Sequence, residues 1–310
     1  MSGMVDDAAG IDPALGFVPS ESSLARRELL HQLSRSRTLV CGCLIVGFWV
    51  FWATVGPWLT PQDPYAVSGD ILHPPSWSHW FGTDALGRDV FSRVLIGGRE
   101  ILVVAPPAAL LGVIAGTAIG LVAGYVGGML DDVVGRIIDA VLALPLLVIA
   151  VLVIASLGSR FVQTNYGDAA TAARTQIIVI AAIFTPVVAR TVRAAVLAER
   201  ELDYVHSAEL QGERRTYVMA FEIVPNVSGV IIVELTVRLG YAIFAVASLR
   251  FLGFGARPPS PDWSLQISEN YPLLLSGTYW WTVLFAALAI ATLVVGVQLV
   301  TDGLLNVIDP

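Results

Sequence analysis

The chain has 310 residues, with 18 basic residues against 25 acidic residues and a formal charge of −7. Hydrophobic residues make up 55% of it and charged residues only 14%, which indicates that lipid solvates most of the chain and excludes an ordinary soluble domain. All basic residues are arginine, so the sequence contains neither a Walker A phosphate-binding loop nor a Schiff-base lysine, and it carries no basic footprint for nucleic acid.

Apolar runs of about twenty residues predict an all-α membrane protein with six transmembrane helices. The predicted spans are Thr38–Leu59, Ile101–Val126, Val133–Leu157, Gln176–Leu197, Val227–Leu252 and Tyr279–Leu304. The first run starts well inside the chain and has no small-x-small cleavage site after it, so we interpret residues 38–59 as an uncleaved anchor. Residues 1–37 before it are expected to form a mobile cytoplasmic tail.

The distribution of arginines predicts which side of the membrane each loop faces. With both termini in the cytoplasm, ten arginines fall inside, namely Arg26, Arg27, Arg35, Arg37, Arg136, Arg190, Arg193, Arg200, Arg214 and Arg215. Six fall outside, namely Arg88, Arg93, Arg99, Arg160, Arg174 and Arg257. This orientation places residues 60–100 outside and the long polar stretch before the fifth span inside.

The polar stretch of residues 199–225 is longer than a connection between two spans requires. Leu202 and Val205 recur on one side of a short helix, Gly212 supplies a break, and Pro225 ends the stretch just before the fifth span. This pattern fits a helix presented to a cytoplasmic partner, and it fits equally well an amphipathic segment that lies on the lipid surface.

Two acid–arginine pairs precede the second span. Asp84 with Arg88, and Asp89 with Arg93, have i,i+4 spacing with the acid first, the favourable order on a helix. They predict a short interfacial helix within the external segment of residues 60–100. Direct contact with a substrate-delivering protein is the other interpretation of the same residues.

The fifth span contains Glu234 and Arg238, four residues apart. Charges inside a membrane are costly unless they pair or face water, so this pair marks a transport pathway or forms a purely structural intrahelical pair. The charges near the inner ends of the third and fourth spans are interpreted as interfacial or snorkelling, and they are Arg136, Asp139, Arg190 and Arg193.

No metal site and no catalytic site is predicted, so the chain is not expected to be an enzyme. Its four histidines share no metal-ligand spacing, and none falls inside a predicted span. Cys41 and Cys43 lie on roughly opposite faces of the first span, and no Gly-x-Ser-x-Gly nucleophile is present.

Five stretches carry a resemblance to a known family. They are FGTDALGRDVFSRVLIGGR (Phe81–Arg99), GYVGGMLDDVVGR (Gly124–Arg136), ALPLLVIAV (Ala143–Val151), the polar stretch from His206 to Pro225, and FLGFGARPPSPDWS (Phe251–Ser264). In this order they resemble the C-type permease subunit of bacterial ABC importers for dipeptides, oligopeptides and nickel. Within the polar stretch, Ala208, Gly212 and Pro225 match the coupling-loop pattern. Four positions depart from it, and these are His206, Ser207, Glu222 and Val224.

The resemblance implies a type I ABC importer permease in the bacterial inner membrane, with a five-helix core at residues 101–310 and a coupling loop at residues 199–225. It implies a second permease subunit, one or two ATPase chains that hold ATP and magnesium, and an extracytoplasmic solute-binding protein, with no cofactor on this chain. The expected ATPase-coupling residues are Tyr204, Val205, Ala208, Glu209, Gly212 and Pro225. The expected external gate or docking residues are Asp84, Arg88, Asp89, Arg93, Pro258, Pro259 and Trp263.

Two other classes of protein compete with this interpretation. A stand-alone secondary transporter or channel would use Glu234 and Arg238 as a gating or proton-linked pair and would work without ATP, but it leaves the long polar stretch without a purpose. An intramembrane enzyme is disfavoured because the sequence offers no catalytic constellation.

Overall fold

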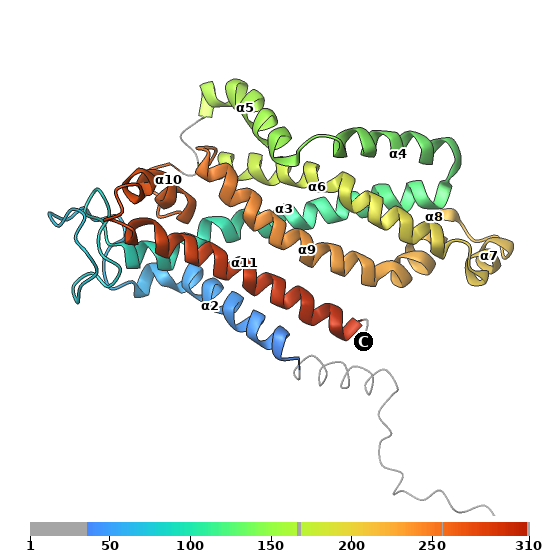
Figure 1. The fold of residues 1–310 in the computed structure, drawn as a ribbon. Helices are drawn as coiled ribbons and strands as arrows, with labels where there is room; N and C mark the ends of the chain where they lie inside the picture. The colour runs from blue at the N-terminus through green and yellow to red at the C-terminus, as the bar shows by residue number, and fades with distance from the viewer. Residues whose placement is uncertain (1–35, 166–168, 256, 309–310) are drawn as a thin grey trace, which may run out of the picture.

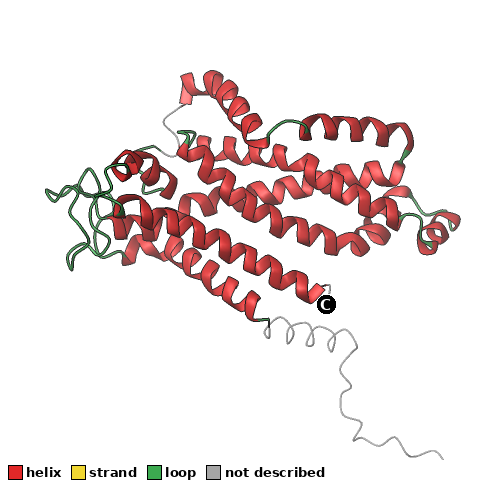
Figure 2. Cartoon of the chain, viewed as in Figure 1, coloured by secondary structure: helices red, strands yellow, loops and turns green. Residues whose placement is uncertain are grey.

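The computed structural model describes residues 36–165, 169–255 and 257–308. The predicted mobile tail therefore lies outside the described residues, except for Ser36 and Arg37. The part of the chain that the structure describes is almost entirely helical, and a single isolated bridge joins Thr83 to Asp89 within a loop. Figure 2 shows an elongated bundle of helices with loops gathered at its two ends.

Five of the described helices are long and apolar enough to cross a membrane. They are α2 (Arg37–Leu59), α3 (Val90–Val126), α6 (Ala169–Glu199), α9 (Val224–Phe251) and α11 (Trp281–Ile308). Each of them overlaps a predicted span, so five of the six predicted spans are confirmed as single helices. The second span starts earlier than predicted, because α3 begins at Val90 rather than at Ile101.

The predicted third span, Val133–Leu157, is wrong as a single helix. The chain instead forms α4 (Gly128–Leu142) and α5 (Leu146–Asn165), which meet at an angle of 88°. Pro145 lies at the break and accounts for it. Proline has no N–H to continue a helix, and it disfavours helical geometry at the residue before it. If the bent pair crosses the membrane once, the described residues contain six spans, the predicted number.

The most extensive helix contact in the bundle joins α3 to α6. One face of α3 presents a glycine every four residues, at Gly112, Gly116, Gly120 and Gly124. A Cβ atom added at Gly116 would lie only 2.6 Å from Val188 Cβ and 2.8 Å from the Thr185 carbonyl oxygen. Because nothing larger than hydrogen fits there, the two backbones approach closely, as small residues allow in membrane helix pairs.

The pair α2 and α11 packs in the same manner. A Cβ atom at Gly42 would lie 2.6 Å from the Val300 backbone nitrogen, and one at Gly303 would lie 2.6 Å from Leu39 Cβ. Trp49 of α2 donates a 3.1 Å hydrogen bond from its indole Nε1 to Thr292 Oγ1 of α11. The first anchor is therefore an integral part of the bundle.

The bundle has two distinct ends (Figure 1). One, which we call the α7 end, carries α7 (Asp203–Leu210), α8 (Arg215–Tyr217) and the π-helical turn η1 (Val218–Ile223), all between α6 and α9. The other, the α10 end, carries the loop of residues 60–89 and α10 (Trp263–Leu274). The start of α2 and the last turns of α11 point away from the α10 end, toward the side of the bundle that carries α7.

The predicted short interfacial helix is wrong, because residues 60–89 form turns and loops and no helix. Asp84 and Arg88 face each other across a tight turn in which Gly87 has a φ of +73°. This left-handed conformation is one that glycine adopts without strain and that ends helical geometry. Asp89 is the N-cap of α3, so the i,i+4 spacing reflects a turn followed by a helix start.

Candidate functional site

The helix α7 and the turn after it form a compact unit at the α7 end. Asp203 lies in the first turn, where a negative charge suits the positive end of the helix dipole. Val205 and Ala208 are 1% and 8% exposed and pack into an apolar cluster with Val196. The chain then turns at Gly212, whose φ of +83° favours glycine. The predicted helix, its buried Val205 and its glycine break are thus confirmed, whereas Leu202, predicted on the same side as Val205, is exposed.

One polar contact fixes α7 to the end of α3, and a second fixes the end of α6 to the same turn. Tyr125 donates a 2.8 Å hydrogen bond from its hydroxyl to Glu209 Oε1. Arg200, just after α6, donates from Nη1 to the carbonyl oxygens of Gly124 at 3.1 Å and of Tyr125 at 3.4 Å. These carbonyls belong to the last turn of α3, where the helix itself supplies no donors. The ends of α3 and α6 and the helix α7 therefore form one connected structure.

A second hydroxyl joins α7 to the helices on either side of it in the sequence. Tyr204 donates a 2.7 Å hydrogen bond to Glu199 Oε1 of α6, and Asn226 Nδ2 of α9 donates to the Tyr204 hydroxyl at 3.1 Å. Burial, together with the hydrogen bond to Glu199, raises the pKa of Tyr204 to about 12. The hydroxyl therefore keeps its proton at neutral pH and remains a donor.

The outward side of α7 presents apolar side chains to solvent. Leu210 is 89% exposed and Leu202 is 46% exposed, with His206 and Ser207 also exposed between them. Exposed leucines on a protruding helix mark an interaction surface rather than a packed core. These four residues lie where a partner has direct access, and the sequence had singled out none of them as a contact.

Three of the six predicted coupling residues are buried or half-buried, and three are exposed. Val205 and Ala208 are buried on the inner face of α7, and Tyr204 is half-buried in its hydrogen-bond network. The other three, Glu209, Gly212 and Pro225, are exposed. The set predicted as contacts therefore includes residues whose role in this conformation is to hold α7 in place.

Two ion pairs connect α4 to α6. Arg193 donates from Nη2 to Asp131 Oδ2 at 2.6 Å and also from Nε to Asp131 Oδ1. Arg190 pairs with Asp139, and both of these side chains are mostly exposed. Arg190, Arg193 and Asp139, interpreted from the sequence as interfacial or snorkelling, each have an ion-pair partner within the protein. The first pair is bidentate and less exposed, so it is the stronger link.

Glu234 and Arg238 form the predicted pair within α9. Arg238 donates from Nε to Glu234 Oε2 at 2.8 Å, and the two side chains are 13% and 11% exposed, respectively. The Arg238 guanidinium also lies 5.5 Å from the ring centre of Tyr241, a residue that is 53% exposed. The pair is neutralised internally and borders an exposed aromatic residue, an arrangement that suits a pathway and a structural pair alike.

Arg88 is the centre of a buried ion cluster at the α10 end. It donates from Nε to Asp84 Oδ2 at 2.6 Å and from Nη2 to Glu269 Oε2 at 2.7 Å. The side chains of Arg88 and Asp84 are each 3% exposed. Burial opposes a charge on Arg88, but its hydrogen bonds to Glu269 and Asp84 outweigh that effect and raise its pKa above the ordinary value. The cluster fastens residues 60–89 to α10.

Asp89 and Arg93 do not pair with each other as their spacing predicted. Asp89 Oδ1 lies 3.0 Å from Nδ1 of His79, which is itself buried. Arg93 is fully buried and donates from Nη1 to the Pro64 carbonyl oxygen at 3.1 Å and from Nη2 to the Ser260 carbonyl oxygen at 2.9 Å. Both residues therefore fix loops onto the start of α3.

Trp263 is a second fastening point between this loop region and α3. Its side chain is fully buried, and its indole Nε1 donates a 2.6 Å hydrogen bond to the Val94 carbonyl oxygen. The ring lies over Gly97 and Gly98, where an added Cβ would approach it to within 2.5 Å and 2.6 Å. The space for the tryptophan is available only because both residues are glycines.

Burial separates the seven predicted docking residues into two groups. Five of them are buried and cannot touch a partner through their side chains in this conformation. They are Asp84, Arg88, Asp89, Arg93 and Trp263. Pro258 and Pro259 are exposed. They are the two members of the set that remain available for contact from outside.

A further buried cluster lies close by and was not predicted. Arg250, at the end of α9, donates from Nη1 to Asp262 Oδ2 at 2.7 Å and from Nε to Gln176 Oε1 at 3.3 Å. Its Nη1 also lies 3.6 Å from Glu100 Oε2. The signal in the sequence was a lone arginine at the end of an apolar run, which requires a partner when it is buried.

The described residues contain no group of three or more His, Cys, Asp or Glu side chains arranged to hold a metal ion. Their charged side chains act instead as fasteners between helices and loops. This arrangement supports the transmission of movement and not a chemical reaction. The helix α7 is bonded to α3, α6 and α9, and the loop of residues 60–89 is held at the α10 end.

Comparison with known proteins identifies the class of membrane protein to which this helical bundle belongs. Residues 116–310 match the family described as the binding-protein-dependent transport system inner membrane component. The dipeptide transport system permease protein DppC of Alkalihalophilus pseudofirmus is 35% identical over 92% of this chain and 89% of its own length. The di/tripeptide transport system permease protein DppC of Pseudomonas aeruginosa is 32% identical over 98% and 96% of the two chains. The glutathione transport system permease protein GsiD of Salmonella typhimurium is 35% identical over 94% and 92%.

The chain therefore belongs to the family of inner-membrane components of binding-protein-dependent transport systems, the permeases of ABC importers. It is a multi-pass inner-membrane permease and not a catalytic subunit. Membership in this family means that it works with a binding protein and with an ATPase.

Proposed function

We propose that the chain is one of two permease subunits of an ATP-driven importer for short peptides, and that α7 is the element through which a separate ATPase moves it. The observation that carries the proposal is the state of α7. Its tip exposes Leu210, while Tyr125 and Tyr204 hold its base to α3, α6 and α9. A segment that only rested on lipid would need no such anchors, whereas a helix that transmits force requires them.

The assignment of short peptides rests on the relatives. Three of them are named for the transport of dipeptides, of di/tripeptides and of glutathione, and each aligns with at least 92% of this chain. Identities of 32% to 35% support the substrate class rather than one particular peptide. The described residues place no metal-ligand cluster on the chain, which gives no support to nickel as the cargo.

The α7 end is assigned to the cytoplasm. The described ends of the chain lie on that side of the bundle, and the excess of arginines in the corresponding loops follows the positive-inside rule. The α10 end then faces outward, so a solute-binding protein would meet residues 60–89 and the exposed Pro258 and Pro259.

The mechanism follows from the rigidity of α7. The second permease subunit would complete the pathway, and one or two ATPase chains would hold ATP and magnesium. When the ATPase domains close, they would draw the two coupling helices together, and the helices fixed to each α7 would move as rigid bodies to open the pathway outward. In this chain the two tyrosine anchors, together with the buried Val205 and Ala208, would pass on the displacement.

The substitution Gly212→Arg tests this function. Gly212 has a φ of +83° and no heavy atom within 4 Å of an added Cβ, so the change strains the turn after α7 and adds bulk on the partner side without disturbing the bundle. The tagged variant is expected to reach the membrane but to lose the ATPase on purification in mild detergent. Gly253→Arg is the matched control, because Gly253 has a φ of +90° and equally open surroundings at the α10 end. Normal ATPase recovery and full transport with Gly212→Arg would contradict the proposal.

The other function raised by the sequence, a stand-alone secondary transporter or channel that uses Glu234 and Arg238, finds no support in the comparisons, because members of this family work with a binding protein and an ATPase. Within the importer, the ion pair in α9 either borders the pathway or stabilises the helix. Uptake by vesicles that contain this chain alone is therefore expected to be absent.

A further inference from the structure

A cavity of about 370 Å³ opens at the α10 end between α2, α3 and the loop that follows α2. This volume lies within the roughly 300–1,000 Å³ typical of small-molecule sites. Four prolines contribute to its wall, and they are Pro57, Pro61, Pro64 and Pro261. Because proline fixes its own φ, such a wall is formed before any ligand arrives.

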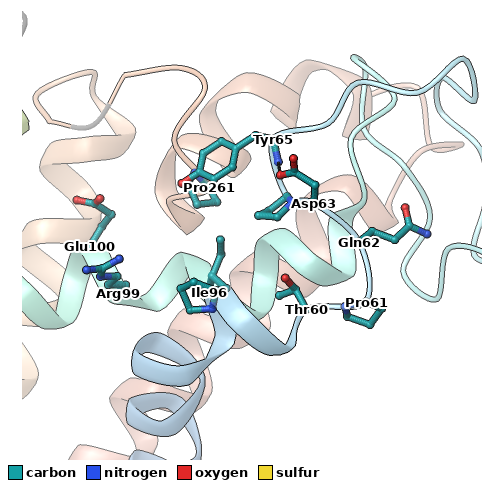
Figure 3. A pocket seen from close by; sticks show the side chains of 11 residues that line it. Thr60, Pro61, Gln62, Asp63, Tyr65, Ile96, Arg99, Glu100 and Pro261 are labelled. Atoms are coloured by element: carbon teal, nitrogen blue, oxygen red, sulfur yellow. Dashed lines mark hydrogen bonds between the residues drawn. The ribbon is translucent and has the colours of Figure 1, made fainter.

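Arg99 and Asp63, which carry opposite charges, stand on different sides of this cavity. Figure 3 shows Arg99 and Glu100 together on one side, Asp63 and Tyr65 on another, and Ile96 between them. Arg99 is exposed, and the described residues offer its guanidinium no hydrogen bond or ion pair. It is a free cation at the edge of a preformed cavity.

The two carboxylates of the cavity are held in different ways. Asp63 Oδ1 accepts a 2.9 Å hydrogen bond from the Tyr65 backbone N–H, and Oδ2 has no partner among the described residues. Glu100 lies 3.6 Å from Arg250, but the hydrogen bond of that Arg250 nitrogen goes to Asp262. Asp63 is therefore the carboxylate available to a ligand cation, whereas Glu100 is already partly neutralised by Arg250.

This pattern favours a ligand that carries both signs of charge. A simple anion at Arg99 would leave Asp63 without a partner, and a simple cation at Asp63 would leave Arg99 without one. A ligand with a negative end, a positive end and an apolar middle matches Arg99, Asp63 and Ile96 in turn. A short peptide with free termini has this distribution of charge.

We propose that this cavity binds short peptides as zwitterions, with Arg99 at the carboxylate and Asp63 at the ammonium group. The inference rests on the proposed function, under which the α10 end receives cargo from the binding protein. The site would bind the peptide transiently after its release from the binding protein and before it enters the pathway. Its affinity would be weak because its charged groups are solvent-exposed.

The test is peptide binding to the complete membrane complex, purified with its partner subunits in nanodiscs and without the binding protein. Equilibrium dialysis with radiolabelled Ala-Ala is expected to show saturable binding to wild type. Arg99→Gln should weaken it roughly threefold to tenfold, the effect of losing one charge-assisted hydrogen bond at a partly exposed site. Arg174→Gln, which removes an exposed arginine from α6 outside the cavity, should leave binding unchanged.

Modified peptides identify the contacts. Ala-Ala amide, which lacks the carboxylate, should bind wild type more weakly and should lose nothing further with Arg99→Gln. N-acetyl-Ala-Ala should show the same relation to Asp63→Asn. Equal binding of Ala-Ala to wild type and Arg99→Gln, or no binding at all, would overturn the inference.

A zwitterionic lipid headgroup offers similar chemistry and gives a distinct result. Phosphatidylethanolamine retained by wild type and released by Arg99→Gln in native mass spectrometry, without peptide binding, would also overturn the peptide assignment. ATP-driven uptake with the binding protein present is measured separately. Its absence in wild type would refute the proposed function, whereas normal uptake without a peptide site at Arg99 would refute only this inference.

Discussion

Tyr125 and Glu209 join the membrane bundle to the helix that protrudes from it, through a 2.8 Å hydrogen bond from the tyrosine hydroxyl to the carboxylate. Tyr125 occupies the last turn of α3, and α3 is the helix that packs most extensively against α6. A displacement of α7 therefore reaches two spanning helices through one contact, without an intervening loop.

Tyr125→Phe is expected to reduce the efficiency of coupling. The ring remains, but α7 loses one hydrogen bond, worth about 1 kcal/mol. ATP hydrolysed per peptide transported should therefore rise several-fold in proteoliposomes, while the amount of complex recovered stays normal. Tyr271→Phe is the control, because the described residues offer its hydroxyl no hydrogen bond. An unchanged ratio in Tyr125→Phe would show that this contact carries no displacement.

Replacing glycine by alanine should have opposite effects on stability at two positions, because one glycine is tightly packed and the other is not. Gly116→Ala places a methyl group 2.6 Å from Val188 Cβ and should destabilise the bundle by about 1–3 kcal/mol. Gly135→Ala in α4 meets no atom within 4 Å and should be neutral or stabilising by up to about 1 kcal/mol, because alanine is the better helix former. Thermal unfolding monitored by size-exclusion chromatography in detergent measures both. Equal melting temperatures would mean that the contact between α3 and α6 accommodates the methyl group and does not depend on a glycine at position 116.

The two ion pairs between α4 and α6 should differ in strength. Arg193→Gln removes a bidentate bond whose side chains are 30% and 13% exposed, and it should speed hydrogen exchange throughout α4. Arg190→Gln breaks a pair that is 59% and 62% exposed, and exposed pairs contribute little. Exchange that rises equally in both variants would contradict the ranking by burial.

The ion cluster at Arg88 should control access to the loop of residues 60–89. Arg88→Met removes the nearer of the two arginines beside the buried Asp84 and leaves Arg93, whose Nε lies 3.9 Å from Asp84 Oδ2. Removing one member of a buried pair costs about 3–5 kcal/mol. Limited proteolysis should then cut this loop much faster than in wild type. Asp70→Asn serves as the comparison, because Asp70 is 64% exposed and lies 3.8 Å from His79. A loop that stays resistant in Arg88→Met would show that other contacts hold it.

Alkaline pH should loosen α7 through Tyr204. Its pKa is raised to about 12, above the value near 10 expected of an unfolded tyrosine, so the neutral hydroxyl stabilises the folded state. That contribution is fully present below pH 10 and is lost as the pH rises through 12. The tyrosinate absorbance of wild type minus Tyr204→Phe should therefore titrate near pH 12. A difference spectrum with a midpoint near 10 would show that the network with Glu199 and Asn226 is absent.

Much of the bundle follows from local sequence patterns. The length of an apolar run fixes a span because a helix of about twenty residues matches the hydrocarbon thickness, and five single spans were found in this way. The break between α4 and α5 was missed because hydropathy continues across Pro145 although the helix does not. The start of α3 was placed too late because its first turns contain polar residues and do not extend the apolar run. Arg93 lies in these turns and is nevertheless fully buried by tertiary contacts.

The candidate sites were predicted less completely, because burial depends on residues far away in the sequence. Arg88 looked like half of a surface pair until Glu269, 181 residues later, proved to be its second partner. Val205 looked like a contact until α6 and η1 were seen to cover it. Periodicity identifies the face of a helix, but only the fold decides whether that face meets solvent, lipid or protein.

Photo-cross-linking from the tip of α7 in native membranes tests directly whether this helix contacts the ATPase. Cys41 and Cys43 are exposed and are first replaced by serine, after which Leu210→Cys carries a benzophenone probe. Leu210 is 89% exposed, and Leu275→Cys at the α10 end, 85% exposed, is the matched position. We expect an ATPase adduct from position 210 whose yield changes with ATP, and none from position 275. An adduct with the solute-binding protein from position 210, or with lipid alone while the ATPase is present, would contradict this contact.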